Sequence, residues 1–205
     1  MQVYIIKESN SDSRVAASPD TVKKMTDWGL NVVIQDNAGL NSNFSNEDYV
    51  KSGALISNEI ADLSKSDLIL KINKPNDDEI TLMNEGSILI ASLDPYNNSE
   101  TLNKLKDKGV TSFAMELMPR ITRAQSMDIL SSQSNLAGYK AVVDATYLFN
   151  KAMPMMMTAA GTIAPAKVMV FGAGVAGLQA IATAKRLGAI VSATDVRMAA
   201  KEQVE

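Results

Sequence analysis

Two kinds of apolar pattern alternate along the N-terminal half of the chain. Short runs rich in Val, Ile and Leu predict strands buried on both faces of a parallel sheet, and they lie at 3–7, 31–35, 68–72, 87–91 and 110–114. Between them, apolar positions of helical spacing predict helices near 46–52, 57–65, 77–84 and 97–107. This βα alternation predicts an α/β fold in which helices cover a parallel sheet.

A further helix, between the first two strands, has clear end signals. Ser18 is a suitable N-cap, Pro19 fits the first helical position, and Gly29 ends the helix. Its predicted apolar side carries Val22, Met25 and Trp28.

Helical periodicity returns over a longer stretch, 134–152, and predicts a long helix in a linker that reaches residue 160. A methionine-rich run follows at 153–157. Because flexible thioethers usually fill irregular gaps in a core, packing is the favoured interpretation of this run, and a functional role is the alternative. The small residues after it are expected to lead directly into the next strand.

That strand, KVMVF at 167–171, runs straight into Gly172, Gly174 and Gly177, and an alanine-rich helix begins at once. This is the context that a dinucleotide-binding fingerprint requires. The first glycine permits a tight turn, the second lets a pyrophosphate approach the backbone, and the third lets helix and strand pack closely. The helix N-terminus offers N–H groups and a positive dipole end to phosphates.

An acidic residue complements the glycine turn. Gly188 ends the helix, 189–194 predicts a second strand, and Asp195 closes it about 20 residues after the turn, where a carboxylate accepts hydrogen bonds from an adenosine ribose. A carboxylate there repels a 2′-phosphate, which predicts NAD(H) rather than NADP(H), although Arg197 nearby could receive that phosphate. Under the alternative interpretation, the glycines serve only a tight turn and Asp195 is an incidental strand-end residue.

A polar loop at 115–135 follows the last strand of the first domain. It carries Arg120, Arg123, Gln125, Asp128 and Ser131. Strand-end loops hold ligands in parallel α/β folds, and guanidinium and amide groups suit a carboxamide or a phosphate. Asp128 could orient Arg120 or accept from the amide of a nicotinamide. An equally supported alternative is a solvated loop in which Ser131 or Ser134 caps the next helix.

Three cations also follow strand ends: Arg14, Lys71 and Lys74. Each could face a cleft between domains. Single exposed cations more often serve solubility, and that is the favoured interpretation.

Composition removes several classes of function. The 205 residues include no histidine and no cysteine, which removes the commonest acid–base group and metal ligand together with thiolate chemistry, so no metal is expected. With 20 basic and 23 acidic residues, the net charge of -3 provides no field for nucleic acid. A secretory signal and an apolar run of about 18 residues are also lacking, which predicts a soluble, cytoplasmic chain without a transmembrane segment.

Longer motifs carry a resemblance to a known family. The stretches PRITRAQSMDILSSQSNLAGYKAVVDA, PMMMTAAGTIAPAKVMVFGAGVAGLQAIATAKRLGA and ATDVRMAAKEQVE resemble the NAD(H)-binding component, the alpha subunit, of proton-translocating NAD(P) transhydrogenase. The similarity is close over 113–205 and looser from Met1 onward. It implies two Rossmann-like domains with parallel sheets, the first a flavodoxin-like domain of alanine dehydrogenase/transhydrogenase type.

The resemblance also assigns roles to residues. It implies that a loop holds the nicotinamide end of NAD(H) through Arg120, Ile121, Thr122, Arg123, Gln125, Asp128 and Ser131. Of these, Arg120, Gln125, Asp128 and Ser131 would position the ring for catalysis. The pyrophosphate would lie against Gly172, Gly174, Val175 and Gly177, and the adenosine ribose against Asp195, Val196 and Arg197.

The resemblance implies partners as well. A hydride would pass from NADH to NADP⁺ on a separate NADP(H)-binding component, coupled to proton movement through a membrane-spanning component. The implied state is a homodimer, bound peripherally on the cytoplasmic side of the inner membrane.

Alanine dehydrogenase is the competing family, since it shares the two-domain plan and an opening similar to SRVAASP at 13–19. Enzymes of that kind use a histidine and a lysine in the cleft, whereas this chain has no histidine and has Asn73 where that lysine would align. Transfer between two nicotinamides moves no substrate proton, so positioning suffices. A non-catalytic NAD-binding module is the third interpretation.

The predicted domains are an N-terminal α/β domain at 1–133, the linker helix region at 134–160, and the first βαβ unit of a dinucleotide-binding domain at 161–205. A complete domain of the last kind has about six strands. The chain is therefore expected to be a piece of a longer protein and, alone, to bind NADH weakly or fold incompletely.

Overall fold

The computed structural model describes residues 1–9 and 11–204. The chain forms two compact units, Met1–Met127 and Asp128–Glu205. Within the described residues, no helix combines the length and the apolar character needed to cross a membrane.

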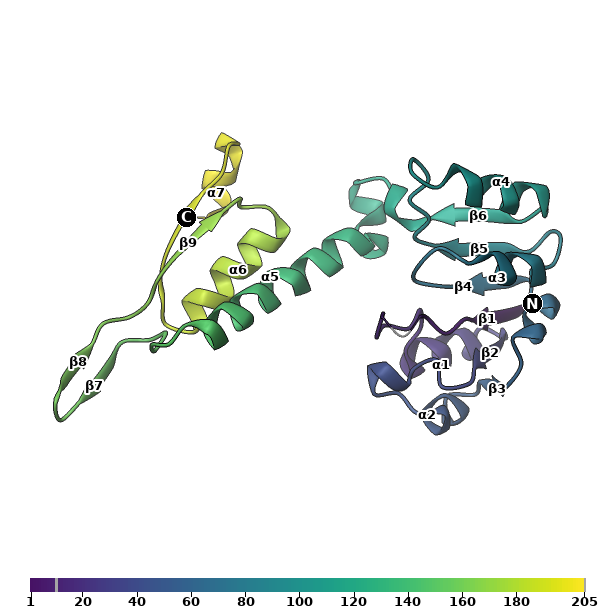
Figure 1. The fold of residues 1–205 in the computed structure, drawn as a ribbon, viewed down its shortest axis with the longest axis horizontal. Coiled ribbons are helices and arrows are strands. Elements are labelled where there is room, and N and C mark those ends of the chain that lie inside the picture. Colours follow the sequence, from purple (N-terminus) through teal and green to yellow (C-terminus); the bar gives the residue numbers. More distant parts are fainter. Residues whose placement is uncertain (10, 205) are drawn as a thin grey trace. The chain divides into compact units, whose positions relative to one another are not determined.

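The first unit is built on a six-stranded sheet (Figure 1). Its strands are β1 (Gln2–Ile5), β2 (Asn31–Gln35), β3 (Leu55–Ser57), β4 (Leu68–Leu70), β5 (Ile88–Ala91) and β6 (Thr111–Ala114). The spatial order is β3-β2-β1-β4-β5-β6, and all neighbours are parallel. The predicted α/β class is confirmed, and the strand order is that of the Rossmann fold rather than of flavodoxin.

Helices pack on both faces of this sheet. They are α1 (Pro19–Asp27), α2 (Asn46–Lys51), α3 (Asp77–Leu82) and α4 (Ser99–Asp107), with short 3₁₀ helices η1 (Leu40–Ser42), η2 (Ile60–Lys65), η3 (Met115–Leu117) and η4 (Thr122–Met127). Alternate side chains of β1 and of the residue after it enter separate cores: Val3 and Ile5 enter one, Tyr4 and Ile6 the other. Burial on both faces explains why the strands are continuous apolar runs.

Most predicted elements of the first unit are confirmed, with three corrections. Ser18 caps α1 by accepting from the Thr21 N–H at 3.3 Å, and Gly29 has φ +81°, as the end signals predict. Trp28 is 75% exposed, so its predicted place on the apolar side is wrong. The segment 57–65 forms only η2, and β3 was not predicted, because its short apolar run at 54–56 ends at Ser57, whereas the equally short β4 lies in a longer run at 68–72.

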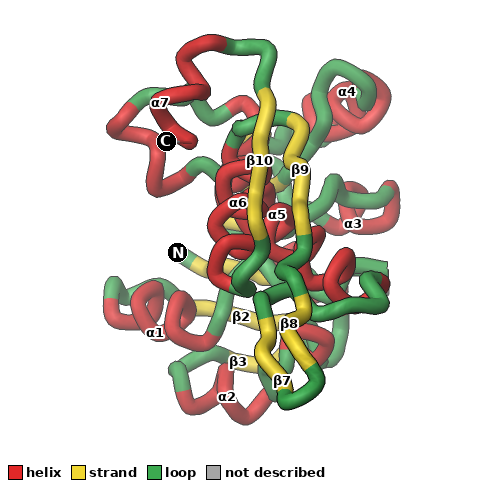
Figure 2. The backbone as a smooth tube through the Cα atoms, turned by 90° about the vertical axis from the view of Figure 1, so that its left-hand side faces the viewer, coloured by secondary structure: helices red, strands yellow, loops and turns green. Residues whose placement is uncertain are grey.

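The second unit begins with the long helix α5 (Ile129–Leu148). An antiparallel hairpin, β7 (Met156–Thr158) with β8 (Gly161–Ile163), is followed by β9 (Lys167–Phe171), α6 (Val175–Arg186) and β10 (Ile190–Thr194). The chain continues through η5 (Met198–Ala200) and α7 (Lys201–Val204). Figure 2 shows β9 and β10 side by side, with α6 packed against both.

Two predictions for the second unit are wrong in detail. The long helix begins at Ile129 rather than 134, because Asp128 supplies the cap. The methionine run was expected to fill a core, yet only Met153 is buried, while Met155, Met156 and Met157 are 59%, 46% and 81% exposed. These side chains lie before and in the β7–β8 hairpin, where a direct lead into the next strand was expected.

Close packing of α5 on α6 fixes the start of α6. A Cβ added to Gly138 of α5 would lie 2.1 Å from the Ala176 carbonyl oxygen in the first turn of α6. Only glycine permits this approach. The first turn of α6 is thereby held from behind by a long helix.

Candidate functional site

The turn between β9 and α6 has the geometry that its glycines predict. Gly172 has φ +94°, a conformation that side chains disfavour, and its N–H donates to the Thr194 carbonyl oxygen of β10 at 2.7 Å. A Cβ on Gly177 would lie 1.7 Å from the Gly172 carbonyl oxygen, so α6 packs directly on the turn. The turn is therefore narrow because Gly172 adopts a positive φ and Gly177 has no Cβ to collide with the Gly172 carbonyl oxygen.

Open space lies over the middle glycine. A Cβ added to Gly174 would meet no atom within 4 Å. Gly174 is also the N-cap of α6 and contributes no side-chain cap, and the helix begins with the 44% exposed Val175. An uncapped helix start beside open space fits a phosphate, because its first N–H groups lack intrahelical acceptors.

Asp195 is held tightly against this turn. Its Oδ2 accepts from the Ala173 N–H at 2.7 Å and from Arg197 Nη2 at 3.0 Å, and its Oδ1 accepts from the Arg197 N–H at 2.8 Å and from Arg197 Nε at 3.0 Å. The Arg197 guanidinium, followed by the N–H groups of Arg197 and Ala173, lowers the pKa of the Asp195 carboxyl well below its usual range. Asp195 is thus ionised and oriented.

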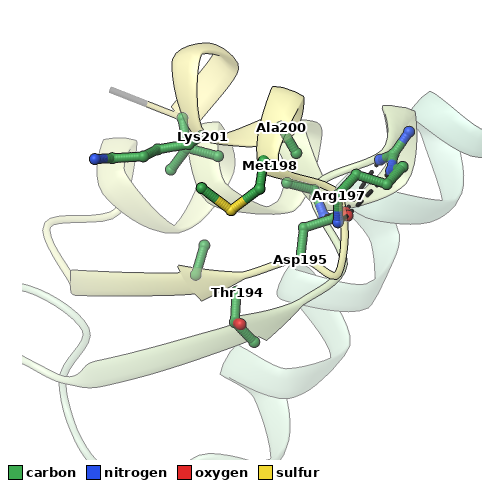
Figure 3. Close-up of a pocket in the computed structure, with 9 residues that line it drawn as sticks. Thr194, Asp195, Arg197, Met198, Ala200 and Lys201 are labelled. Atoms are coloured by element: carbon green, nitrogen blue, oxygen red, sulfur yellow. Dashed lines mark hydrogen bonds and ion pairs between the residues drawn. The ribbon is translucent and has the colours of Figure 1, made fainter.

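A pocket of about 390 Å³ opens beside this carboxylate (Figure 3). Its lining is Ala173, Ala193, Thr194, Asp195, Arg197, Met198, Ala200, Lys201 and Val204. In Figure 3 the Arg197 side chain is turned toward Asp195, whereas Lys201 extends away from the pair. Val196, another predicted site residue, is 101% exposed and does not line the pocket.

The polar loop forms η4 and the start of α5. Arg120, Ile121, Thr122, Arg123 and Gln125 are all exposed in the first unit. Asp128 begins the second unit.

Asp128 and Ser131 are brought together as a helix cap. Asp128 Oδ1 accepts from the Ser131 N–H at 2.9 Å, and Oδ2 accepts from the Ser131 hydroxyl at 2.6 Å. This satisfies an N–H group that the helix itself leaves unpaired. The cap is thus Asp128, not Ser131 or Ser134, and its two members hold the end of the loop.

Sequence reasoning did not single out Glu116, which holds the start of the loop. Its Oε1 accepts from the Leu93 N–H at 2.8 Å and also from the Asp94 N–H, both just after β5. Its Oε2 is buried and has no hydrogen-bond partner among residues 1–9 and 11–204. A single acid after a strand gives no pattern that could reveal this role.

A buried ion-pair cluster lies where the strand order of the first sheet reverses, at the carboxyl ends of β1 and β4. Lys71 Nζ lies 3.0 Å from Glu79 Oε1 and 3.7 Å from Glu8 Oε2, and all three side chains are at most 6% exposed. The favoured prediction, that Lys71 is a solubilising cation, is therefore wrong. Parallel α/β folds bind ligands at such reversal points, but here Lys71 pairs with both carboxylates. The N–H groups of Ile72 and Asn76 donate to Glu8 and Glu79 respectively.

The same edge continues outward through Asn73. Its Nδ2 donates to Glu8 Oε2 at 2.9 Å and to Asp12 Oδ2 at 2.8 Å. Arg14 donates to the same Asp12 through Nε at 2.9 Å and Nη2 at 2.7 Å. This Arg14 pairing lowers the pKa of the Asp12 carboxyl below its usual range.

Two family models match the chain, and together they extend over both units. The model of the alanine dehydrogenase/PNT N-terminal domain matches residues 4–137, and that of the corresponding C-terminal domain matches 141–205. The chain belongs to the alanine dehydrogenase/PNT family. Its first family domain holds the exposed arginines of the loop, and its second holds the glycine turn and Asp195.

The relatives that match the chain include both transhydrogenase subunits and alanine dehydrogenases. An NAD(P) transhydrogenase subunit alpha protein of Rhodospirillum rubrum is 51% identical over 100% of this chain and 55% of the relative. Alanine dehydrogenase of Staphylococcus saprophyticus is 30% identical over 100% of this chain and 56% of the relative. The chain thus spans about half the length of these relatives.

A solved structure supports the same assignment. The transhydrogenase of Sinorhizobium meliloti has a TM-score of 0.96 and 56% sequence identity, over 100% of this chain and 61% of that chain. Both units therefore have the fold of this alanine dehydrogenase/PNT relative.

Proposed function

We propose that this chain is the NAD(H)-binding portion of a proton-translocating NAD(P)⁺ transhydrogenase. The observation that supports this most directly is the Asp195 carboxylate, ionised beside a pocket and bonded to the N–H of Ala173 in an uncapped glycine turn. That arrangement suits a dinucleotide. The greater identity to transhydrogenase relatives than to alanine dehydrogenases favours this member of the family.

In this proposal the residues bind and orient rather than transfer protons. Gly172, Gly174, Val175 and Gly177 hold the pyrophosphate, and Asp195, Val196 and Arg197 surround the adenosine ribose. The loop holds the nicotinamide end through Arg120, Ile121, Thr122, Arg123, Gln125, Asp128 and Ser131. When bound, NADH supplies the hydride, which a neighbouring NADP⁺ receives.

The remaining elements of the proposal concern the assembly. NADP(H) is held on a partner component, and a membrane-spanning component couples the transfer to proton movement. The chain pairs as a homodimer and lies on the cytoplasmic side of the membrane. The exposed Met155, Met156 and Met157 leave apolar surface on the second unit that an assembly of this kind could cover.

An alanine dehydrogenase activity is the second candidate, and the 30% identity to that enzyme speaks for it. Two features speak against it. The chain has no histidine to move a substrate proton. Asn73, where a lysine would align, is engaged by Glu8 and Asp12.

One assay separates these candidates from a binding module without activity. The full-length protein is mixed with an NADP(H)-binding component, and NADH-dependent reduction of an NADP⁺ analogue is followed, with alanine plus NAD⁺ as the control reaction. Reduction that requires the partner supports the proposal. Oxidation of alanine without the partner would overturn it, as would NADH binding without transfer in the presence of the partner.

Arg120→Ala tests the orienting role of the loop. We expect the rate of transfer to fall more than the affinity for NADH, because an orienting group acts most strongly on the reacting geometry. Arg186→Ala, an exposed arginine at the end of α6 and outside the loop, is a comparison for charge. Equal losses of rate and affinity in Arg120→Ala would contradict the orienting role.

A further inference from the structure

The carboxylate that is proposed to receive the adenosine ribose has no acceptor position left. A carboxylate offers about four lone-pair positions. In Asp195 four donors fill them: the N–H of Ala173, the N–H of Arg197, and Nε and Nη2 of the Arg197 guanidinium. A ribose hydroxyl can donate to Asp195 only if one of these donors leaves.

The four donors differ in how easily they leave. The two N–H groups belong to the backbone, one at the glycine turn and one after β10, so they stay where the fold puts them. The guanidinium belongs to a side chain that is 62% exposed, while the Asp195 side chain is only 9% exposed. Ion pairs with such an exposed partner are weak in water, so the guanidinium is the donor that can be exchanged.

We propose that the Arg197 guanidinium is a displaceable cap on Asp195, which the adenosine ribose of a bound nucleotide replaces. This inference rests on the proposed function and adds a step to it. The cap keeps the carboxylate oriented before a nucleotide arrives, and the two backbone N–H groups keep it oriented afterward. The hydroxyls of the ribose then fill the positions that Nε and Nη2 vacate.

The cap has a measurable consequence. A ligand with ribose hydroxyls must displace the Arg197 guanidinium from Asp195, and this displacement weakens its binding. A ligand without these hydroxyls does not need the displacement. AMP and 2′,3′-dideoxy-AMP carry the same phosphate and the same base. A variant that loses the positive charge of Arg197 should therefore change the phosphate attraction equally for both, and the ratio of their affinities reports the ribose contacts alone.

The test is calorimetric titration of the full-length protein with AMP, 2′,3′-dideoxy-AMP and NADH. In Arg197→Ala we expect the preference for AMP over the dideoxy analogue to rise about two- to fivefold, the range set by an exposed ion pair. Arg197→Lys, which cannot make the two-pronged contact, should give a smaller rise. Arg186→Ala, an exposed arginine at the opposite end of α6, removes the same charge and should leave the preference unchanged.

A second variant, Asp195→Asn, tests whether Arg197 acts through Asp195. In Asp195→Asn the preference for AMP over the dideoxy analogue should be small, and adding Arg197→Ala should not raise it. If Arg197→Ala leaves the preference unchanged or lowers it while the wild-type protein binds NADH, the cap is overturned and the proposed nucleotide site survives. If the wild-type protein binds neither NADH nor AMP, the proposed function is overturned and the cap with it.

Discussion

Each of the two units contains an aspartate–arginine pair with the same hydrogen bonds, but the surroundings of the two pairs differ. Asp12 and Arg14 in the first unit, and Asp195 and Arg197 in the second, are spaced Asp-x-Arg and make the same three hydrogen bonds. In each pair the Arg N–H and Nε donate to Oδ1 of the aspartate and Nη2 donates to Oδ2. The three-residue motif therefore fixes a local geometry and not a function.

The fourth donor distinguishes the two pairs. Asp12 receives it from the side chain of Asn73, which also bonds to Glu8 of the buried ion-pair cluster. Asp195 receives it from the backbone of Ala173, inside the glycine turn and beside a pocket. Asp12 is thus linked to the buried ion-pair cluster, whereas Asp195 lies beside a pocket that suits a ligand.

The largest expected effect concerns the network behind the first pair. Lys71→Met leaves Glu8 and Glu79 buried without their cation, which costs about 3–5 kcal/mol of unfolding free energy. Chemical denaturation of the two variants measures it. Lys74→Met is the matched control, because Lys74 is exposed and its Nζ makes an exposed hydrogen bond to Oδ1 of Asn98, and it should change stability by less than about 0.5 kcal/mol. Similar losses in both variants would mean that the cluster does not stabilise the first unit.

The next effect concerns the turn behind the second pair. Gly177→Ala places a Cβ against the Gly172 carbonyl oxygen and should destabilise the second unit by about 3 kcal/mol, which also removes NADH binding. Gly174→Ala meets no atom, so its cost in stability should be only that of a poorer N-cap, at most about 1 kcal/mol, while NADH affinity falls because the methyl group occupies the space over the turn. Thermal unfolding and titration on both variants check this contrast. An unchanged NADH affinity in Gly174→Ala would argue against a phosphate there.

Sequence alone predicted the glycine turn because each residue of that motif has its own local requirement. Gly172 needs a positive φ, Gly177 needs the absence of a Cβ, and Asp195 follows at a fixed distance along the chain. The order of strands and helices was equally accessible, since burial on both faces leaves a continuous apolar run. Short elements such as β3 and the β7–β8 hairpin carry too few residues to leave such a pattern.

The ion-pair cluster was not predictable because its members meet only through the tertiary fold. Glu8 follows β1, Lys71 follows β4 and Glu79 lies in α3, and each looks like an ordinary surface charge in sequence. The likeness of the Asp12–Arg14 pair to Asp195–Arg197 was not predictable either, because nothing in the sequence marks Asp12 as the partner of Arg14. The cap at Asp128 was not predicted because Ser131 and Ser134 nearby are equally good N-caps.

A third test separates the two aspartates by function. Asp195→Asn removes a charged acceptor from the proposed ribose site and should weaken NADH binding by about tenfold to a hundredfold, as expected for hydrogen bonds to a charged group. Asp12→Asn makes the same chemical change in the first unit and should leave NADH affinity unchanged. Fluorescence titration with NADH compares them, and equal losses would show that the two pairs do not differ as the pocket suggests.

The smallest effect is the pH dependence of the first pair. The folded-state pKa of Asp12 is lowered by Arg14, so the pair contributes stability above the ordinary pKa of about 3.9 and loses it as the pH falls through the lower, folded value. Because the Arg14 side chain is 45% exposed, Arg14→Met should cost at most about 1 kcal/mol at pH 7. That difference from the wild type should persist down to about pH 4 and shrink below it, since the unfolded chain then binds a proton at Asp12, which the folded wild-type protein takes up only at a lower pH. Urea unfolding at pH 7, 5 and 3.5 measures the trend, and a difference that grows as the pH falls would contradict the assigned pairing.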